Sequence, residues 1–250
     1  MSLILAIHSS KGGTGKTSIA INLACAYALS GKNVCLLDMD MKAPSSFNNM
    51  FPHPERWLND VLNGECSIKD VIVDATNEVA SEGKIYVGYS NPNIGAIRDM
   101  SGKDRKWQAR ALKLLMIART ELINSGIDVI LLDTAPGVDF ISVNSIAASD
   151  HVLMVVKPGE CNLQGMRQVI DGVYNSLGKN YVVVENMCHE GQLSLCGSKV
   201  GIPSMISIPC ACDVSIKGNS EVFTLTRPQH IFSTSIFDLR DTISYMLERP

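Results

Sequence analysis

A glycine-rich segment between an apolar run and a helical stretch constrains this chain more than any other feature. Residues 10–17 read Ser-Lys-Gly-Gly-Thr-Gly-Lys-Thr and follow the apolar run Leu3–His8. Glycines free successive backbone N–H groups from side-chain obstruction, so that these groups can form a nest for phosphate oxygens. The positive end of the helix expected at Lys16–Ser30 adds to the attraction. The segment therefore predicts a strand, a phosphate-binding loop and a helix, in that order.

The loop departs at one position from the pattern G-x-x-x-x-G-K-[ST], because Ser10 stands where the first glycine belongs. Lys16 is still placed to reach the β- and γ-phosphates, and the Thr17 hydroxyl to ligate Mg²⁺. The alternative is a glycine-rich turn that binds nothing, which we disfavour because strand, glycines and helix agree. The candidate nucleotide-binding residues here are Lys11, Gly12, Gly13, Thr14, Gly15, Lys16, Thr17 and Ser18.

Short apolar runs alternate with helical stretches along the rest of the chain. Several runs are almost continuously apolar, which is typical of parallel strands buried on both faces. Besides Leu3–His8, strands are expected at Asn33–Asp38, Lys84–Tyr89, Asp128–Asp133, His151–Lys157, Tyr181–Glu185 and Met205–Ile208. Helices are expected at Lys16–Ser30, Asp104–Ser125, Val138–Ser149, Leu163–Leu177 and Ser235–Leu247.

This alternation predicts one α/β domain over residues 1–250: a doubly wound, mostly parallel twisted sheet of about seven or eight strands, with helices on both faces. Gly31 and Gly126 stand where helices should stop, as C-terminal caps do. In such sheets ligands bind at the carboxyl ends of the strands. The residues at those ends must carry the argument for function.

Charge and composition exclude several classes of protein. Apolar residues make up 46% and charged residues 19%, which favours a globular chain over a disordered one. A net charge of −3 gives no support for a broad nucleic-acid footprint. No apolar run approaches the roughly 18 residues that span a bilayer, and the mixed-charge end of the chain argues against a membrane anchor. The eight cysteines form no disulfide framework, so we expect a reducing, cytoplasmic compartment.

Carboxylates end two of the expected strands. Asp38 and Asp40 lie one residue apart and point to the same face, with Asp38 behind the metal, although aspartates at strand ends often only start a turn. Asp133 follows four apolar residues and can hold Mg²⁺ through water. Gly137 lets the backbone approach a γ-phosphate, so its N–H group could distinguish ATP from ADP.

Residues 11–17, Lys-Gly-Gly-x-Gly-Lys-Thr, resemble the deviant Walker A loop of the ParA/MinD superfamily, which implies a P-loop NTPase fold. The resemblance implies that Lys11 reaches the partner's nucleotide in a dimer that sandwiches two ATP molecules; on composition alone it could be a solvated loop lysine. It also implies that Asp40 orients the attacking water and that Asp133 to Gly137 form the family's D-x-x-x-G switch. Slow ATP hydrolysis would then use Lys11, Lys16 and Asp40 as catalytic residues.

The same resemblance covers two later segments. In this superfamily an asparagine at the position of Asn186 contacts the adenine edge, and the loop from Pro209 to Asp213 covers the base. An asparagine after a strand is also a common turn former, which keeps the simpler interpretation open.

Four cysteines fall in the last third of the chain: Cys188, Cys196, Cys210 and Cys212. Val184–Met187 resembles the run before the C-x-x-C of Mrp-type carriers, and Cys210-Ala-Cys212 is similar to the C-x-C of nickel-insertion ATPases. Adjacent thiolates could bind Zn²⁺ or an iron–sulfur cluster. We favour the interpretation that these cysteines are reduced and partly buried, because their spacing matches no metal-binding pattern closely.

Three functions follow from these motifs. The first is an ATP-dependent switch that dimerises and recruits a protein partner in cell division, partitioning or positioning. The second is a maturation ATPase for a metal or an iron–sulfur cluster. The third, a small-molecule ligase or kinase, is disfavoured because it leaves Lys11 without a use and no motif for a second substrate is found.

Overall fold

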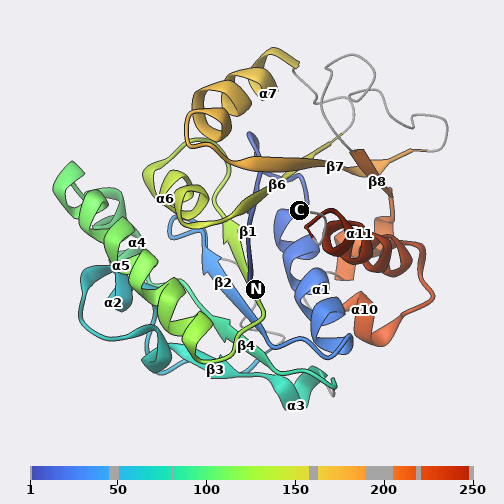
Figure 1. Cartoon of the computed structure of the whole chain (residues 1–250), viewed down its shortest axis with the longest axis horizontal. Helices are drawn as coiled ribbons and strands as arrows, with labels where there is room; N and C mark the ends of the chain where they lie inside the picture. Colours follow the sequence, from blue (N-terminus) through green and yellow to red (C-terminus); the bar gives the residue numbers. More distant parts are fainter. Residues whose placement is uncertain are drawn as a thin grey trace.

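Our computed structural model describes residues 2–44, 51–79, 81–157, 163–189, 205–217 and 221–247. These residues form a sheet with the strand order β3-β4-β2-β5-β1-β6-β7-β8, in which every neighbouring pair is parallel except β3 with β4 (Figure 1). The strands are β1 (Leu3–His8), β2 (Val34–Met39), β3 (Ile72–Asp74), β4 (Ile85–Gly88), β5 (Val129–Thr134), β6 (His151–Val156), β7 (Asn180–Cys188) and β8 (Met205–Pro209).

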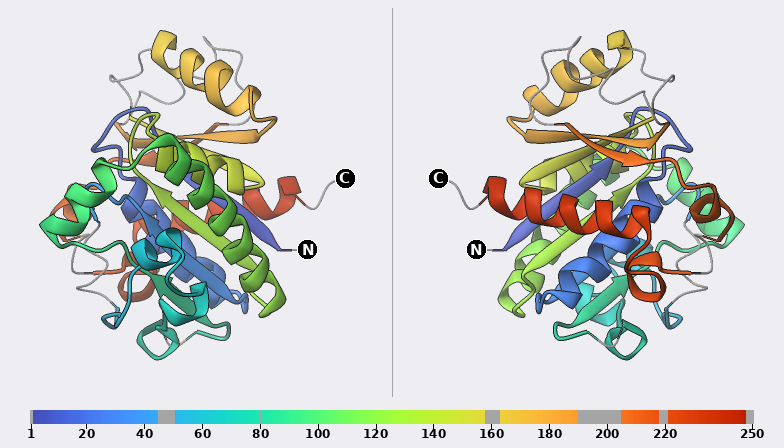
Figure 2. Two further views of the ribbon diagram at one scale, coloured as in Figure 1. Left: turned by 90° about the vertical axis from the view of Figure 1, so that its left-hand side faces the viewer. Right: turned by 90° about the vertical axis from the view of Figure 1, so that its right-hand side faces the viewer.

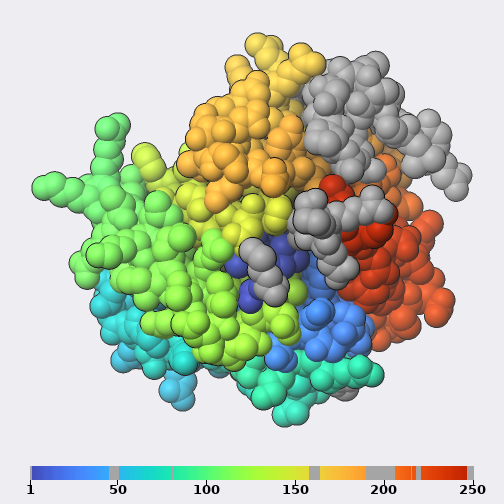
Figure 3. All heavy atoms as spheres, viewed as in Figure 1, coloured from blue at the N-terminus to red at the C-terminus, as the bar shows by residue number. Residues whose placement is uncertain are grey.

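Helices cover both faces of this sheet (Figures 1 and 2). On one face lie α1 (Lys16–Leu29), α10 (Phe223–Thr226) and α11 (Ile231–Leu247). On the other lie α2 (Leu58–Asn63), α5 (Arg105–Asn124), α6 (Phe140–Ala148) and α7 (Leu163–Val169), which continues as a π-helix, η3 (Ile170–Asn175). The shorter elements are η2 (Ile68–Asp70), α3 (Thr76–Val79), α4 (Ile94–Ser101) and α9 (Cys212–Lys217). In the space-filling view the green segment with α4 projects from the margin (Figure 3).

Alternate side chains of the central strands pack into two separate apolar cores, one on each face of the sheet. Leu5 and Ile7 of β1 pack with α1 and α11, whereas Ile4 and Ala6 of the same strand pack with α5, α6 and η3. All four side chains are at most 2% exposed. This two-sided burial explains why the strand sequences are nearly continuously apolar.

The predicted fold class is confirmed, and several boundaries need correction. The helix expected at Leu163–Leu177 changes to π geometry at Ile170, and the last helix begins at Ile231 rather than Ser235. The antiparallel edge strand Ile72–Asp74 was not predicted, because three residues are too short to show a period. Both capping glycines have φ of +84°, as a left-handed C-terminal cap requires.

No helix among the described residues is both long enough and apolar enough to cross a membrane.

Candidate functional site

The phosphate loop runs from the carboxyl end of β1 to the first turn of α1. Gly13 has φ of +74° and Gly15 has φ of +88°, a backbone region that L side chains rarely adopt. A Cβ at Gly15 would also collide with the amide nitrogen of Asn186. Glycine is therefore required at position 15 by both backbone geometry and packing.

Lys16 and Thr17 open α1 at this loop. Lys16 is only 7% exposed, and its ammonium group forms no ion pair within the described part of the chain. Burial lowers the pKa of Lys16, and the nearby carboxylates of Asp133 and Asp40 oppose that shift. A buried ammonium group without an anion at hydrogen-bonding distance is costly, so this position is suited to an anionic ligand.

Asp133 is the next-to-last residue of β5 and lies beside the first turn of α1. Its Oδ2 accepts a hydrogen bond of 2.7 Å from the Thr17 hydroxyl, while its buried Oδ1 has no partner among the described residues. The buried Thr14 hydroxyl likewise has no partner there. A hydroxyl and a carboxylate with a free oxygen fit the oxygen ligands that Mg²⁺ prefers, directly or through water. Thr17 and Asp133 would hold the ion, whose charge would offset that of the phosphates.

Binding of magnesium nucleotide should release a proton from this site. Burial raises the pKa of Asp133 to about 7, although the bond from Thr17 and the charge of Lys16 oppose the shift. The protonated form of Asp133 is therefore populated near pH 7, and the cation requires the ionised form. Calorimetry at pH 7 in two buffers of different ionisation enthalpy should show a net release of protons when MgADP binds. Equal binding enthalpies in both buffers would contradict this, and ADP without Mg²⁺ is the matched control.

Asp38 and Asp40 lie at the end of β2, next to β5. Asp38 pairs in register with Asp133 and is fully buried, and its Oδ1 accepts the backbone N–H of Asp40. Asp40 Oδ1 accepts the backbone N–H groups of Lys42 and Ala43, at 3.3 and 2.9 Å. Burial raises the pKa of Asp40, against the charge of Lys16. Asp40 thus both shapes a turn and faces the phosphate loop.

Gly137 does not present a free N–H group to a phosphate in this structure. Its N–H donates to the Ser9 carbonyl at 2.8 Å, and its φ is +82°. The expected γ-phosphate contact would therefore require this hydrogen bond to break. The sequence could not show this, because the partner Ser9 lies far away along the chain, directly after β1.

The two expected base-contacting groups both have protein partners. The Asn186 side chain donates to the Thr14 carbonyl at 2.9 Å and is almost fully buried, so it supports the phosphate loop. Asp213 lies in α9, four residues beyond Pro209; its Oδ2 forms an ion pair with Arg227 at 3.3 Å and lies 3.2 Å from His230 Nε2. An adenine contact by Asn186 or Asp213 remains a prediction.

Two residues that are fully buried beside the loop, His8 and Tyr174, were not among those predicted for the site. His8 Nδ1 lies 2.6 Å from the Tyr174 hydroxyl, and His8 Nε2 lies 2.7 Å from the Gly137 carbonyl oxygen. The only signal was a histidine at a strand end just before the phosphate loop.

The cysteine cluster gains no support as a metal site. Within the described residues, no group of three histidine, cysteine or acidic side chains comes together to hold a metal ion. Cys188 donates through its thiol to the Glu185 carbonyl, and its own carbonyl accepts the N–H of Cys210. Cys212 is exposed, and Cys196 lies outside the described residues.

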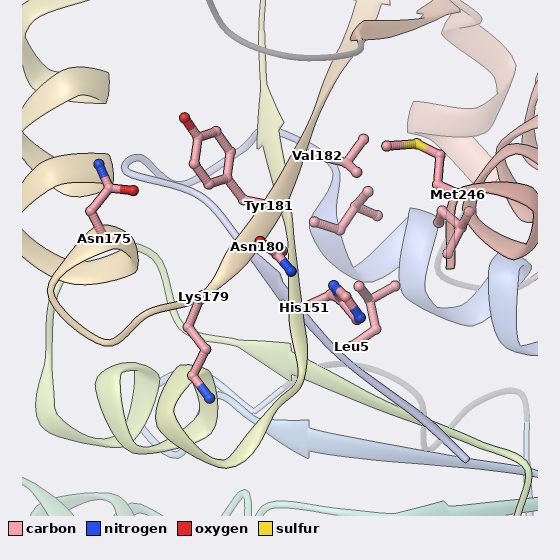
Figure 4. A pocket seen from close by; sticks show the side chains of 10 residues that line it. Leu5, His151, Asn175, Lys179, Asn180, Tyr181, Val182 and Met246 are labelled. Atoms are coloured by element: carbon pink, nitrogen blue, oxygen red, sulfur yellow. The ribbon is translucent and has the colours of Figure 1, made fainter. Parts of the chain in front are cut away.

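A cavity of about 360 Å³ lies at the opposite, amino-terminal edge of β1, β6 and β7 (Figure 4). Leu5, Val182 and Met246 contribute apolar side chains, and His151 a polar one. The Lys179 ammonium group points away and donates to the carbonyls at the end of α6. None of the predicted site residues lines this cavity. We therefore do not take the cavity as the candidate site, although it could hold a small molecule.

Comparison with known sequences agrees with this geometry. A protein-family model described as "AAA domain" matches residues 2–181. The chain is 28% identical to the antiactivator FleN of Pseudomonas aeruginosa over 196 residues, which are 76% of this chain and 63% of FleN. It is 28% identical to the sporulation initiation inhibitor protein Soj of Bacillus subtilis over 175 residues, 69% of this chain and 65% of Soj. The chain thus spans less than two thirds of the length of these relatives.

Solved structures share the fold. The cell division ATPase MinD of Pyrococcus furiosus has a TM-score of 0.81 at 21% identity, covering 98% of this chain and 100% of MinD. The septum site-determining protein MinD of Pyrococcus horikoshii, complexed with Mg-ADP, has a TM-score of 0.78 at 18% identity, covering 99% and 98%. Because the family model covers residues 2–181, the chain belongs to the family described as "AAA domain", and with relatives such as FleN and Soj it is a member of the ParA/MinD superfamily of P-loop ATPases.

Proposed function

We propose that this chain binds ATP with Mg²⁺ at the phosphate loop and hydrolyses it slowly to ADP and phosphate. The observation that carries the proposal is the convergence of Lys16, Thr17 and Asp133 at one edge of the sheet, with a buried cation and an unpartnered carboxylate oxygen. Membership of an ATPase superfamily and the Mg-ADP bound by the MinD of Pyrococcus horikoshii support it. Asp40 is the group that we assign to the attacking water.

The second part of the proposal is that ATP brings two copies of the chain together. Lys11 is exposed, and within the described part of the chain its ammonium group has no ion pair. The neighbouring residues Val138 and Phe140 are 59% and 55% exposed, large apolar side chains that water does not favour. A Cβ added at Gly12 would lie 3.9 Å from the Pro136 side chain, so the two segments lie side by side. A second copy would cover this surface and place Lys11 beside the partner's phosphates.

The γ-phosphate would then act as the switch, because it distinguishes the dimeric state from the monomeric one. The ATP-bound dimer would recruit a protein partner, as a positioning or partitioning ATPase does. The complex of MinD with MinC from Aquifex aeolicus supports such a role. The alternative of a metal-maturation ATPase rests on cysteines that the described residues do not bring together as a metal site.

The Lys11→Ala variant tests the dimer directly. We expect the parent chain to double its mass from 27.1 kDa when saturated with a non-hydrolysable ATP analogue and Mg²⁺, and Lys11→Ala to stay monomeric. The reason is that the lysine supplies its charge only across the interface. Light scattering coupled to size exclusion measures this.

The matched control is Lys32→Ala, which removes an exposed lysine at the far end of α1. It should dimerise like the parent, and Lys11→Ala should still bind the analogue as a monomer, more weakly than Lys32→Ala by the coupling that dimerisation supplies. An unchanged ATP dimer in Lys11→Ala would refute the role of this lysine across the interface.

A further inference from the structure

Both backbone polar groups of Gly137, its N–H and its carbonyl oxygen, are hydrogen-bonded. Its N–H donates to the Ser9 carbonyl at 2.8 Å, and its carbonyl oxygen lies 2.7 Å from His8 Nε2. Both partners belong to the end of β1 and the start of the phosphate loop. The conformation of the loop after β5 is therefore fixed by the chain segment that leads into the nucleotide site.

The chemistry of the partners assigns the proton positions. A carbonyl oxygen can only accept, so His8 Nε2 must carry the proton that it donates to Gly137. In the neutral ring Nδ1 is then an acceptor, and the Tyr174 hydroxyl must donate to it, at 2.6 Å. Burial lowers the pKa of His8 to about 4, so the ring is neutral at pH 7 as this arrangement requires.

Tyr174 lies in the π-helix Ile170–Asn175, which continues α7. Its ring is fully buried, edge-on to His8 with centroids 5.7 Å apart, and tilted against Tyr181 at the same separation. Single π turns inside helices are rare overall, and those that occur are often found at functional sites. α7 also lies beside the phosphate loop, since its residue Met166 lines a small recess there together with Ser10 and Lys11.

We propose that His8 is a positioning residue that latches Gly137 away from the γ-phosphate, and that its bond to Tyr174 couples this loop to the segment α7–η3. This rests on the proposed function, because a γ-phosphate is what would compete with Ser9 for the Gly137 N–H. ATP favours the unlatched loop, and release of Gly137 alters the bond that holds His8 against Tyr174. The π-helical segment thereby responds to which nucleotide is bound.

Two isosteric substitutions of His8 separate its two hydrogen bonds. In His8→Gln the amide nitrogen takes the place of Nε2 and keeps the donor to Gly137, but the acceptor for Tyr174 is lost. In His8→Asn the amide oxygen takes the place of Nδ1 and keeps that acceptor, but the donor to Gly137 is lost. Tyr174→Phe removes only the hydroxyl and keeps the packed ring, so it tests the coupling even where a His8 variant folds poorly.

The first measurement is the ratio of affinities for a Mg²⁺-bound ATP analogue and for MgADP. His8→Asn should raise this ratio in favour of the ATP analogue by roughly three- to tenfold, the factor that one ordinary hydrogen bond supplies. His8→Gln and Tyr174→Phe keep the donor to Gly137 and should shift the ratio less than His8→Asn does. An unchanged ratio in His8→Asn overturns the latch.

The second measurement is amide hydrogen exchange. Without nucleotide, exchange at Gly137 should be faster in His8→Asn than in the parent and unchanged in His8→Gln. In the parent the ATP analogue should alter exchange at Ile170–Asn175, and Tyr174→Phe should abolish that response. A full response in Tyr174→Phe overturns the coupling.

Nitrogen NMR of His8 decides the latch even without bound nucleotide. The ring should show a protonated Nε2 and a bare Nδ1 whose shift moves in Tyr174→Phe. A protonated Nδ1 would overturn the proposal. If the parent bound no nucleotide at all, the proposed function would fail, whereas the NMR signature and the Gly137 exchange rate would still decide the latch.

Discussion

Replacing Lys16 with alanine is expected to abolish detectable nucleotide binding, with an increase in Kd of at least about 100-fold. Lys16 is the buried cation of the site, and the other charges near it are the carboxylates of Asp133 and Asp40. A hydrogen bond to a charged group contributes about 1.5–3 kcal/mol. Loss of contacts to two phosphates therefore exceeds the roughly 2.8 kcal/mol that corresponds to 100-fold. Without Lys16, the two carboxylates would also repel the incoming phosphates.

Calorimetry with MgADP and with a non-hydrolysable ATP analogue measures this loss. Lys32→Ala is the matched control, since it deletes an exposed lysine at the other end of α1 and should bind like the parent. Thermal unfolding of both variants checks that the fold is intact. Binding by Lys16→Ala within tenfold of the control would show that phosphate is held elsewhere.

Features that depend on neighbouring residues in the chain could be predicted from the sequence. The phosphate loop is one, because its geometry follows from glycines in succession, and Gly13 and Gly15 have the positive φ that only glycine adopts freely. The central strands are another, since burial on both faces demands apolar residues at consecutive positions. Asp133 followed for the same reason, as the first polar residue after the four apolar residues that begin a buried strand.

Features that depend on partners far along the chain could not be predicted. Asn186 binds the Thr14 carbonyl across 172 positions, and no local pattern shows that its amide supports the loop rather than facing solvent. The bond between Gly137 and Ser9 is a similar case, because only the folded sheet places the ends of β5 and β1 together. The π-helix at Ile170 has the same apolar spacing as an ordinary helix, so its sequence predicts only a helix.

The second large effect is expected at Asp40, where substitution should separate binding from turnover. We predict that Asp40→Ala and Asp40→Asn bind the ATP analogue within about threefold of the parent and hydrolyse ATP about 100- to 10,000-fold more slowly, the range for loss of a positioned base. Asp40 contacts no loop residue by hydrogen bond among the described residues, so little binding energy should depend on it. Phosphate release under saturating ATP measures turnover.

The asparagine variant matters because Asp40 also has a structural task. Its Oδ1 accepts the N–H groups of Lys42 and Ala43, and the alanine variant loses that turn together with the charge. Asparagine keeps an oxygen in the same place and removes only the ionisable group. If Asp40→Ala is slow but Asp40→Asn hydrolyses ATP at the parental rate, the carboxylate serves the turn alone and the attacking water must be oriented by another group. If both are slow while binding is retained, the charge itself is required for turnover.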